Sequence, residues 1–397
     1  MKSLALTTFS PPRPRATRLL FITVTVTIIV SMSFMCLLPS LRYRYHLANE
    51  PGGNSQDSRH KLNQLTCANV SARYPGKPPI KAAASSVSFD VTSFVGSVPR
   101  ISPQTTSKSR LRAISINTMG TELPGLMCLS TLFSAALNNV PLEIYGSNAY
   151  FERISEGISN KKSAKMDILQ SILCQLDPLD PILMVDAFDV IFQRPWDEIE
   201  YLYAKRWNSP EFVMSTESNC YPRFIPKVCV GNDFPPVPPN GVPFINSGVI
   251  VGKAGAMLEI IGHALEVRKE GIFGNKTKVM GDQAAYARAY YDHYRRKGFM
   301  MDHLSELSSS PNPPKPAFVE LDGGNGRYFW WDPHTRNVPM IVHLNGNGKN
   351  MYWNKQYYLR NGKLKRELRE QVSNYTFIFE GETATVEGIC KDWMELN

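Results

Sequence analysis

Residues 182–192 read ILMVDAFDVIF, an apolar run that contains two acids, Asp186 and Asp189. An apolar run of this kind is typical of a central strand in a parallel sheet, because both faces of such a strand are buried. A carboxylate buried there without a partner costs several kcal/mol or stays protonated. The strand is therefore expected to end at Asp186, where both acids reach a polar cleft.

A bound cation would make the two carboxylates tolerable. Two hard oxygen ligands across one turn suit Mg²⁺ or Mn²⁺ that carries a diphosphate. The alternative is that Asp186 caps a turn while Asp189 pairs with Arg194. A D-x-x-D pattern alone leaves both interpretations open.

The segments on the N-terminal side of this strand predict an α/β fold. LRAISIN (111–117) and PLEIYG (141–146) are typical of short strands, and ELPGLMCLSTLFSAALNN (122–139) between them predicts a helix. KKSAKMDILQSILCQL (161–176) predicts a second helix before the apolar strand. This alternation implies a mostly parallel central sheet with helices on both faces. Ligands of such sheets bind beyond the carboxyl ends of the strands, where Asp186 is expected.

The composition excludes some classes of protein. With 397 residues, of which 43% are hydrophobic and 11% aromatic, the chain can form a packed core over one large or two smaller domains. Its net charge is +9, but only 20% of its residues are charged and no Lys/Arg block follows residue 44. A nucleic-acid partner is therefore not expected, and the oligomeric state is left open.

The N-terminal region predicts a membrane anchor. Residues 19–41 contain no charged side chain and are long enough to cross a bilayer as a helix. Four basic residues precede this segment and two follow it closely, so the positive-inside rule places the N-terminus in the cytosol. We expect a single-pass type II protein with a cytosolic tail over 1–18 and a signal-anchor over 19–41. A cleaved signal peptide is the alternative, but the apolar run is longer than a usual h-region.

The next segment agrees with a chain that enters the secretory lumen. Residues 42–108 are rich in Ser, Pro, Gly and Thr, which is typical of a flexible stem. N-glycosylation sequons begin at Asn69, Asn275 and Asn374. The expected location is the Golgi or endoplasmic reticulum membrane, with the larger part of the chain in the lumen.

The cysteines fit an oxidising compartment. Seven cysteines become six when Cys36, inside the apolar segment, is set aside, and six can pair fully. Cys220 and Cys229 enclose a short proline-containing loop, and we predict that they form a disulfide. Zinc is the alternative, but the chain has no C-x-x-C motif.

Four further segments follow the acidic strand in a fixed order. They are EFVMSTESNCYP (211–222), FINSGVIVGKAG (244–255), GDQAAYARAYY (281–291) and PMIVHLNGNGK (339–349). Together with VDAFDVIF, this ordered set resembles the glycosyltransferase domain of the procollagen lysyl hydroxylases and the procollagen galactosyltransferases. The resemblance implies a Rossmann-like GT-A fold over residues 109–360, a UDP-sugar donor and Mn²⁺ or Mg²⁺. Residues 361–397 would then be a C-terminal extension.

The resemblance also implies a metal site. Asp186, Asp189 and His343 match the metal ligands of the family, and His343 opens HLNGNGK, which matches a His-Gly-Asn-Gly element. Leu344 replaces the first glycine of that element. A structural role is the alternative for a lone histidine.

Several residues match the donor site of the family. These are Thr118, Lys165, Phe188, Asn246, Ser247, Gly248, Gln283, Asn345 and Gly346. Phe188 replaces a tyrosine, which keeps a ring but loses a hydroxyl. The Asn-Ser-Gly at 246–248 is expected at a strand end, where the small residues would let the sugar approach, and an ordinary turn is the alternative. Lys165 is expected either to meet phosphate or sugar or to lie on a solvated helix face.

The candidates for catalysis are carboxylates. An inverting transfer needs a base near the acceptor hydroxyl, and Asp282 and Glu217 match acids of the family at a helix start and in a loop. Tyr221 is expected on the acceptor side, with loops over 222–242 and 302–316. The expected activity is transfer of a hexose, galactose or glucose, from a UDP-sugar to a protein or glycan acceptor. An inactive membrane-anchored lectin or scaffold and a secreted hydrolase with paired acids are the alternatives.

Overall fold

The protein is described by a computed structural model that covers residues 110–118, 125–146, 161–221, 236–270, 281–293, 298–311, 317–320, 328–345, 370 and 372–395. All of them lie in the second of two units into which the chain divides, Arg59–Asn397. The predicted tail (1–18), signal-anchor (19–41) and stem (42–108) lie outside the described residues. Within those residues, no helix has both the length and the apolar character to cross a bilayer.

The strands predicted before the acidic turn are confirmed. β1 (Arg112–Ile116) and β2 (Leu142–Tyr145) form at the two predicted short strands, and β3 (Pro181–Asp186) forms at the apolar run that ends at Asp186. The other strands are β4 (Val190–Phe192), β5 (Phe212–Glu217), β6 (Phe244–Lys253), β7 (Phe299–Met301), β8 (Ser308–Ser310), β9 (Ala317–Glu320), β10 (Tyr328–Trp331), β11 (Ile341–His343), β12 (Thr376–Phe379) and β13 (Glu382–Thr385).

The helices connect these strands over both faces of the sheet. They are α3 (Gly125–Met127), the π-helix η2 (Cys128–Leu132), α4 (Phe133–Leu137), α6 (Lys161–Leu173), α7 (Trp196–Tyr201), the π-helix η3 (Leu202–Arg206), α8 (Ala254–Glu270), α9 (Asp282–His293) and α12 (Val386–Glu395). The two helices predicted from the sequence, over 122–139 and 161–176, correspond to α3–η2–α4 and to α6.

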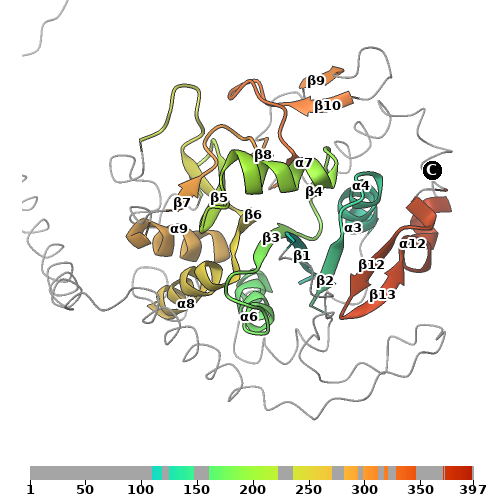
Figure 1. The fold of residues 1–397 in the computed structure, drawn as a ribbon, viewed down its shortest axis with the longest axis horizontal. Coiled ribbons are helices and arrows are strands. Elements are labelled where there is room, and N and C mark those ends of the chain that lie inside the picture. Colours follow the sequence, from blue (N-terminus) through green and yellow to red (C-terminus); the bar gives the residue numbers. More distant parts are fainter. Residues whose placement is uncertain are drawn as a thin grey trace, which may run out of the picture. The chain divides into compact units, whose positions relative to one another are not determined.

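The central sheet is mostly parallel, as predicted (Figure 1). Its order is β13–β12–β2–β1–β3–β6–β5–β8–β11–β4, and β7 pairs with β5 at one side of this path. β6 runs antiparallel to both β3 and β5, and β4 and β13 each run antiparallel to the one strand they pair with. β9 and β10 form a separate antiparallel pair. The chain therefore has a mixed α/β fold with a mostly parallel central sheet.

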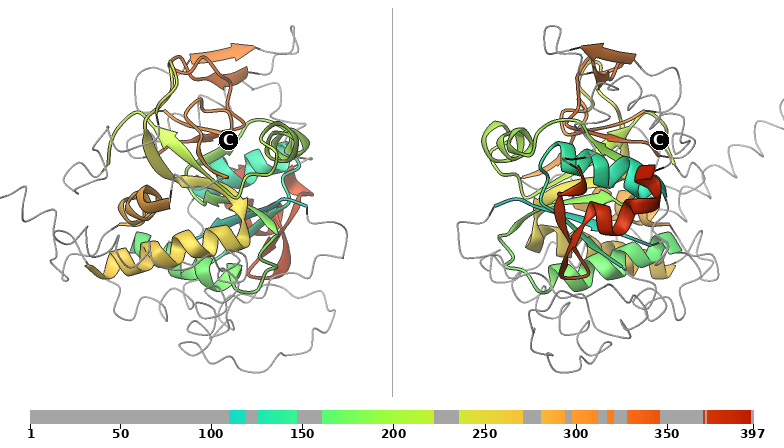
Figure 2. Two further views of the ribbon diagram at one scale, coloured as in Figure 1. Left: turned by 60° about the vertical axis from the view of Figure 1, so that its left-hand side comes forward. Right: turned by 90° about the vertical axis from the view of Figure 1, so that its right-hand side faces the viewer.

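Alternate side chains of the central strands enter two different cores. On β3, Ile182 and Met184 pack with α6, α8 and α9, whereas Leu183 and Val185 pack with the α3–η2–α4 segment and α12. Figure 2 shows these groups of helices on opposite sides of the strands. A strand that contributes to two cores must be apolar at every position, which explains the run that precedes Asp186.

The C-terminal segment, predicted as an extension of the domain, adds strands to the sheet. β12 pairs in parallel with β2, and β13 completes a hairpin beside it. A disulfide joins Cys128 of η2 to Cys390 of α12. Cys174 and Cys220 are also disulfide-bonded, but Cys229 lies outside the described residues, so the Cys220–Cys229 pairing stays a prediction.

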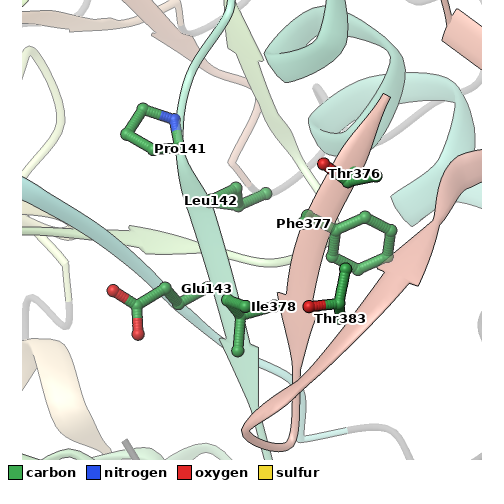
Figure 3. A pocket seen from close by; sticks show the side chains of 7 residues that line it. All are labelled: Pro141, Leu142, Glu143, Thr376, Phe377, Ile378 and Thr383. Carbon is green, nitrogen blue, oxygen red and sulfur yellow. The ribbon is translucent and has the colours of Figure 1, made fainter. Parts of the chain in front are cut away.

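A shallow pocket lies where β2 and β12 diverge at their amino ends (Figure 3). The residues that line it are Pro141, Leu142, Glu143, Thr376, Phe377, Ile378 and Thr383. The Glu143 carboxylate already accepts two hydrogen bonds from the Arg112 guanidinium, at 2.7 and 2.6 Å. The pocket lies at the end of the strands opposite to Asp186, so it is not part of the site described below.

Candidate active site

The predicted metal ligands meet at the carboxyl edge of the sheet. Asp186 is the last residue of β3, Asp189 lies in the turn before β4, and His343 is the last residue of β11. β4 and β11 pair antiparallel, with His343 opposite Val190. Each of the three side chains offers one ligand atom, and these atoms all lie within 4.8 Å of one another. Sheet pairing thus brings together residues that are far apart in sequence.

The residues present fit a divalent cation. Ligand atoms on opposite sides of such a cation lie about 4–5 Å apart, which the three side chains can match. His343 Nε2 is buried, lies 3.4 Å from an oxygen of each aspartate, and makes no hydrogen bond. The Asp186 side chain is 24% exposed, so a ligand can reach the group from solvent. The two carboxylates suit a hard divalent cation such as Mn²⁺ or Mg²⁺.

The alternative partner of Asp189 is engaged elsewhere. Arg194 Nε donates to Glu198 at 2.7 Å, one turn along α7. Its guanidinium also lies over the ring of Phe329, 5.3 Å from the ring centre. The salt bridge between Asp189 and Arg194 that the sequence left open is therefore not formed.

The electrostatic field of the carboxylates acts on His343. Burial disfavours the imidazolium, but Asp189 and Asp186 outweigh it and raise the pKa of His343 to about 9. In the metal-free site the imidazolium thus neutralises part of the charge that a divalent cation would otherwise neutralise.

Asn246 and Gly248 hold the His343 ring in place. Asn246 Oδ1 accepts the Gly248 N–H at 2.8 Å and lies 2.8 Å from His343 Nδ1. A hydrogen bond at Nδ1 leaves the Nε2 lone pair for a metal. The Asn-Ser-Gly lies inside β6 instead of at a strand end, and β6 is antiparallel to its neighbours, so its early residues still reach the carboxyl edge.

Gly248 leaves room for the His343 ring, which lies directly against its Cα. A Cβ atom on Gly248 would lie 2.0 Å from His343 Cε1. Gly248→Ala is therefore expected to displace the ring, to lower the free energy of unfolding by about 1–3 kcal/mol, and to weaken Mn²⁺ binding at least about tenfold. Calorimetry with Mn²⁺ and thermal unfolding measure the two effects.

Gly281→Ala is the matched control for this change. A Cβ atom on Gly281 would meet nothing within 4 Å. This variant should keep the Mn²⁺ affinity and the stability of the wild type. Equal Mn²⁺ affinity in Gly248→Ala and in wild type would show that the position of the His343 ring does not depend on Gly248.

Lys165 is buried and links two acids. Its Nζ lies 2.7 Å from Asp186 Oδ1, 2.7 Å from Asp282 Oδ2 and 3.3 Å from the carbonyl oxygen of Ser247. An ammonium group has three N–H donors, and all three have a protein acceptor here. Lys165 thus lies neither on a solvated helix face nor with a donor free for phosphate. It orients Asp186 instead, whose other oxygen faces His343.

A second cluster surrounds Glu217 at the end of β5. Glu217 accepts a hydrogen bond from Gln283 Nε2 on one oxygen and from Asn345 Nδ2, at 2.6 Å, on the other. Burial raises the pKa of Glu217, although the hydrogen bonds from Asn345 and Gln283 oppose this. Tyr221 is 62% exposed nearby, and Gln283 also donates to its carbonyl oxygen at 3.3 Å.

The remaining donor candidates lie at the same edge. Thr118 follows β1, whose Ile116 is in register with Asp186. Phe188 is half-buried and packs against the core beside α4. Leu344, which replaces a glycine of the family, packs with Trp330, and its N–H donates to the Asp189 carbonyl at 2.6 Å. Gly346 lies outside the described residues.

Ser310 is a residue of the site that no pattern in the sequence indicates. Residues 308–310, predicted within an acceptor-facing loop, form β8 between β5 and β11. Ser310 lies in register with Glu217, and its Oγ is 3.4 Å from His343 Nδ1. A run of three serines carries no apolar alternation, so no pattern in the sequence indicates this strand.

Comparison with known proteins identifies the family. Residues 110–367 match the family model described as the PLOD GT domain. A search of curated proteins found no match. Among solved structures, a glycosyltransferase involved in glycosylation of the major capsid of PBCV-1 is 11% identical, with a TM-score of 0.37 over 62% of this chain and 98% of that chain. Mouse xyloside xylosyltransferase 1, in its apo form, is 14% identical, with a TM-score of 0.38 over 60% and 98%.

Proposed function

Because the chain belongs to the PLOD GT domain family of glycosyltransferases, we propose that it transfers a hexose from a UDP-sugar to a hydroxyl group of a protein or glycan acceptor. The group formed by Asp186, Asp189 and His343 carries this proposal, since its ligand atoms lie within 4.8 Å of one another at the carboxyl edge of the sheet. Galactose and glucose are the favoured sugars.

The three ligands would hold Mn²⁺ or Mg²⁺ together with the diphosphate. When bound, the cation would offset the negative charge that develops on the diphosphate as the sugar–phosphate bond breaks. The ion pair with Lys165 orients the Asp186 carboxylate, and the hydrogen bond with Asn246 orients the His343 ring. Thr118, just after β1, and Phe188, in the turn between β3 and β4, are the candidates for contact with the nucleoside.

Glu217 is a better candidate for the base than Asp282. Asp282 forms a buried ion pair with Lys165 at 2.7 Å, and protonation would break that pair. Glu217 is held by the neutral amides of Gln283 and Asn345, and burial raises its pKa. A carboxylate can accept about four hydrogen bonds, so Glu217 can also accept the proton of an acceptor hydroxyl.

We further propose that the protein acts in the Golgi or endoplasmic reticulum as a type II membrane protein. Nucleotide sugars, Mn²⁺ and secretory acceptors would then meet the domain in the lumen. The uncharged segment 19–41 and the sequon at Asn374, an exposed residue, support this proposal.

Release of UDP tests the proposed activity. The full-length protein is incubated with Mn²⁺, a panel of UDP-sugars and acceptor mixtures of glycans or secreted glycoproteins. We expect UDP release from one hexose donor, which a chelator abolishes and Asp189→Ala lowers by at least about 100-fold. A folded protein that binds glycans but releases no UDP from any donor would favour a lectin with this fold.

A further inference from the structure

One polar row of the α3–η2–α4 segment holds the backbone of the turn that carries Asp189. The Ser130 hydroxyl donates to the Phe188 carbonyl at 2.9 Å, and the Thr131 hydroxyl donates to the Val190 carbonyl at 3.2 Å. Both side chains are fully buried, with 0% exposure. A buried hydroxyl is costly unless it is hydrogen-bonded, so these bonds explain why two polar residues occupy a core position.

The row continues along the next strand. Ser134 Oγ accepts the Phe192 N–H at 3.0 Å, and Asn138 Nδ2 donates to the Phe192 carbonyl at 2.7 Å. β4 is the last strand on its side of the sheet and pairs with β11 on one edge. The polar row therefore satisfies backbone groups on the other edge, where an edge strand would have unpaired groups.

The local form of the helix brings the first two hydroxyls onto the turn. Ser130 and Thr131 lie in the π-helix Cys128–Leu132, and single π-helical turns occur often at functional sites. The Cys128–Cys390 disulfide joins this same turn to α12. The disulfide thus anchors the same π-helix whose Ser130 and Thr131 bond to residues 188 and 190.

We propose that Ser130 and Thr131 are positioning residues of the metal site. They fix the 186–190 turn from one side, while β11 fixes it from the other through the Leu344 N–H to the Asp189 carbonyl at 2.6 Å. The hydrogen bonds on the two sides of the turn therefore determine how far Asp189 lies from His343. This inference rests on the metal site of the proposed function and adds residues that do not contact the metal.

Three single variants of the full-length protein test the proposal, with Mn²⁺ alone as the probe. Ser130→Ala and Thr131→Val remove the bonds to the turn, and Ser134→Ala removes a similar bond at the far end of β4. All three should fold and lose similar stability. Mn²⁺ affinity, measured by calorimetry, should fall about tenfold in the first two and stay within about twofold of wild type in Ser134→Ala. Ser130→Thr, which keeps the hydroxyl, should bind Mn²⁺ with the affinity of the wild type.

Amide hydrogen exchange in the metal-free protein gives a readout that needs no metal. Exchange in residues 187–190 should rise in Ser130→Ala and not in Ser134→Ala. Equal Mn²⁺ affinity in wild type and Ser130→Ala, or an equal loss in Ser134→Ala, would overturn the positioning role. Absence of Mn²⁺ binding in wild type would instead overturn the metal site of the proposed function.

Discussion

The affinity for Mn²⁺ is expected to rise about tenfold for each pH unit between about pH 6 and pH 8. In the metal-free protein, Asp189 and Asp186 raise the pKa of His343 to about 9, although burial alone would lower it. A metal binds the neutral imidazole, so binding below that pKa releases a proton. The affinity therefore increases with pH and levels off near pH 9. Calorimetric titrations at three pH values, in buffers of different ionisation enthalpy, measure the slope and the proton release.

His343→Gln is the variant that should remove this dependence. It should bind Mn²⁺ weakly and with little change across the range. His334→Gln is the control, because His334 is exposed and its Nε2 lies 3.2 Å from the Gly241 carbonyl. This variant should keep the slope of wild type. A wild-type affinity that stays constant from about pH 6 to pH 8 would contradict the role of His343 as a ligand.

The raised pKa of His343 also makes the stability of the metal-free fold depend on pH. The pKa of His343 is higher in the folded protein than its ordinary value of 6.5, so the protonated form stabilises the fold. This contribution is fully present below the unfolded-state pKa and is lost as the pH rises through about 9, where the loss reaches about 3 kcal/mol. Chemical unfolding of wild type and His343→Gln at both ends of this range separates it from other titrations.

The sequence could predict the elements on which the site is built because they follow simple patterns. Short strand-like segments predict β1 and β2, an apolar run predicts β3, and acids at the end of such a run must face a cleft or a cation. The family resemblance added His343, which lies on a strand remote in sequence. Sheet pairing, which brings β4 and β11 together, is set by the whole fold and is not visible in a local pattern.

The parts that sequence could not predict depend on tertiary partners. Ser308–Ser310 form a buried strand whose partners lie in other segments: Asp302 accepts the Ser308 N–H at 2.9 Å, and Asp332 accepts the Ser309 hydroxyl at 2.7 Å. A glycine is needed at position 248 because the His343 ring, which belongs to β11, lies against it. The sequence around Lys165 fits a solvated position and a buried position equally well, and the two acidic neighbours of Lys165 in the fold decide between them.

Lys165→Met is expected to lower the free energy of unfolding by about 3–5 kcal/mol, because it leaves buried carboxylates without their cation. Lys165 pairs with Asp186 and with Asp282 at 2.7 Å each, and its own side chain is 6% exposed. Burial raises the pKa of Asp186, but Lys165 and His343 outweigh it and hold that pKa well below its usual range. Without Lys165, part of that effect is lost and the turn at Asp186 is destabilised.

Chemical unfolding of the metal-free protein measures this loss, and three comparisons test its cause. Lys253→Met is the control, since the Lys253–Glu211 pair is 26% and 29% exposed, and exposed pairs contribute at most about 1 kcal/mol. The double variant Lys165→Met/Asp282→Asn should recover part of the loss, because one of the two uncompensated charges is gone. Added Mn²⁺ should also recover part of it, through Asp186 alone. A loss in Lys165→Met no larger than that in Lys253→Met would show that the buried ion pairs do not hold this site together.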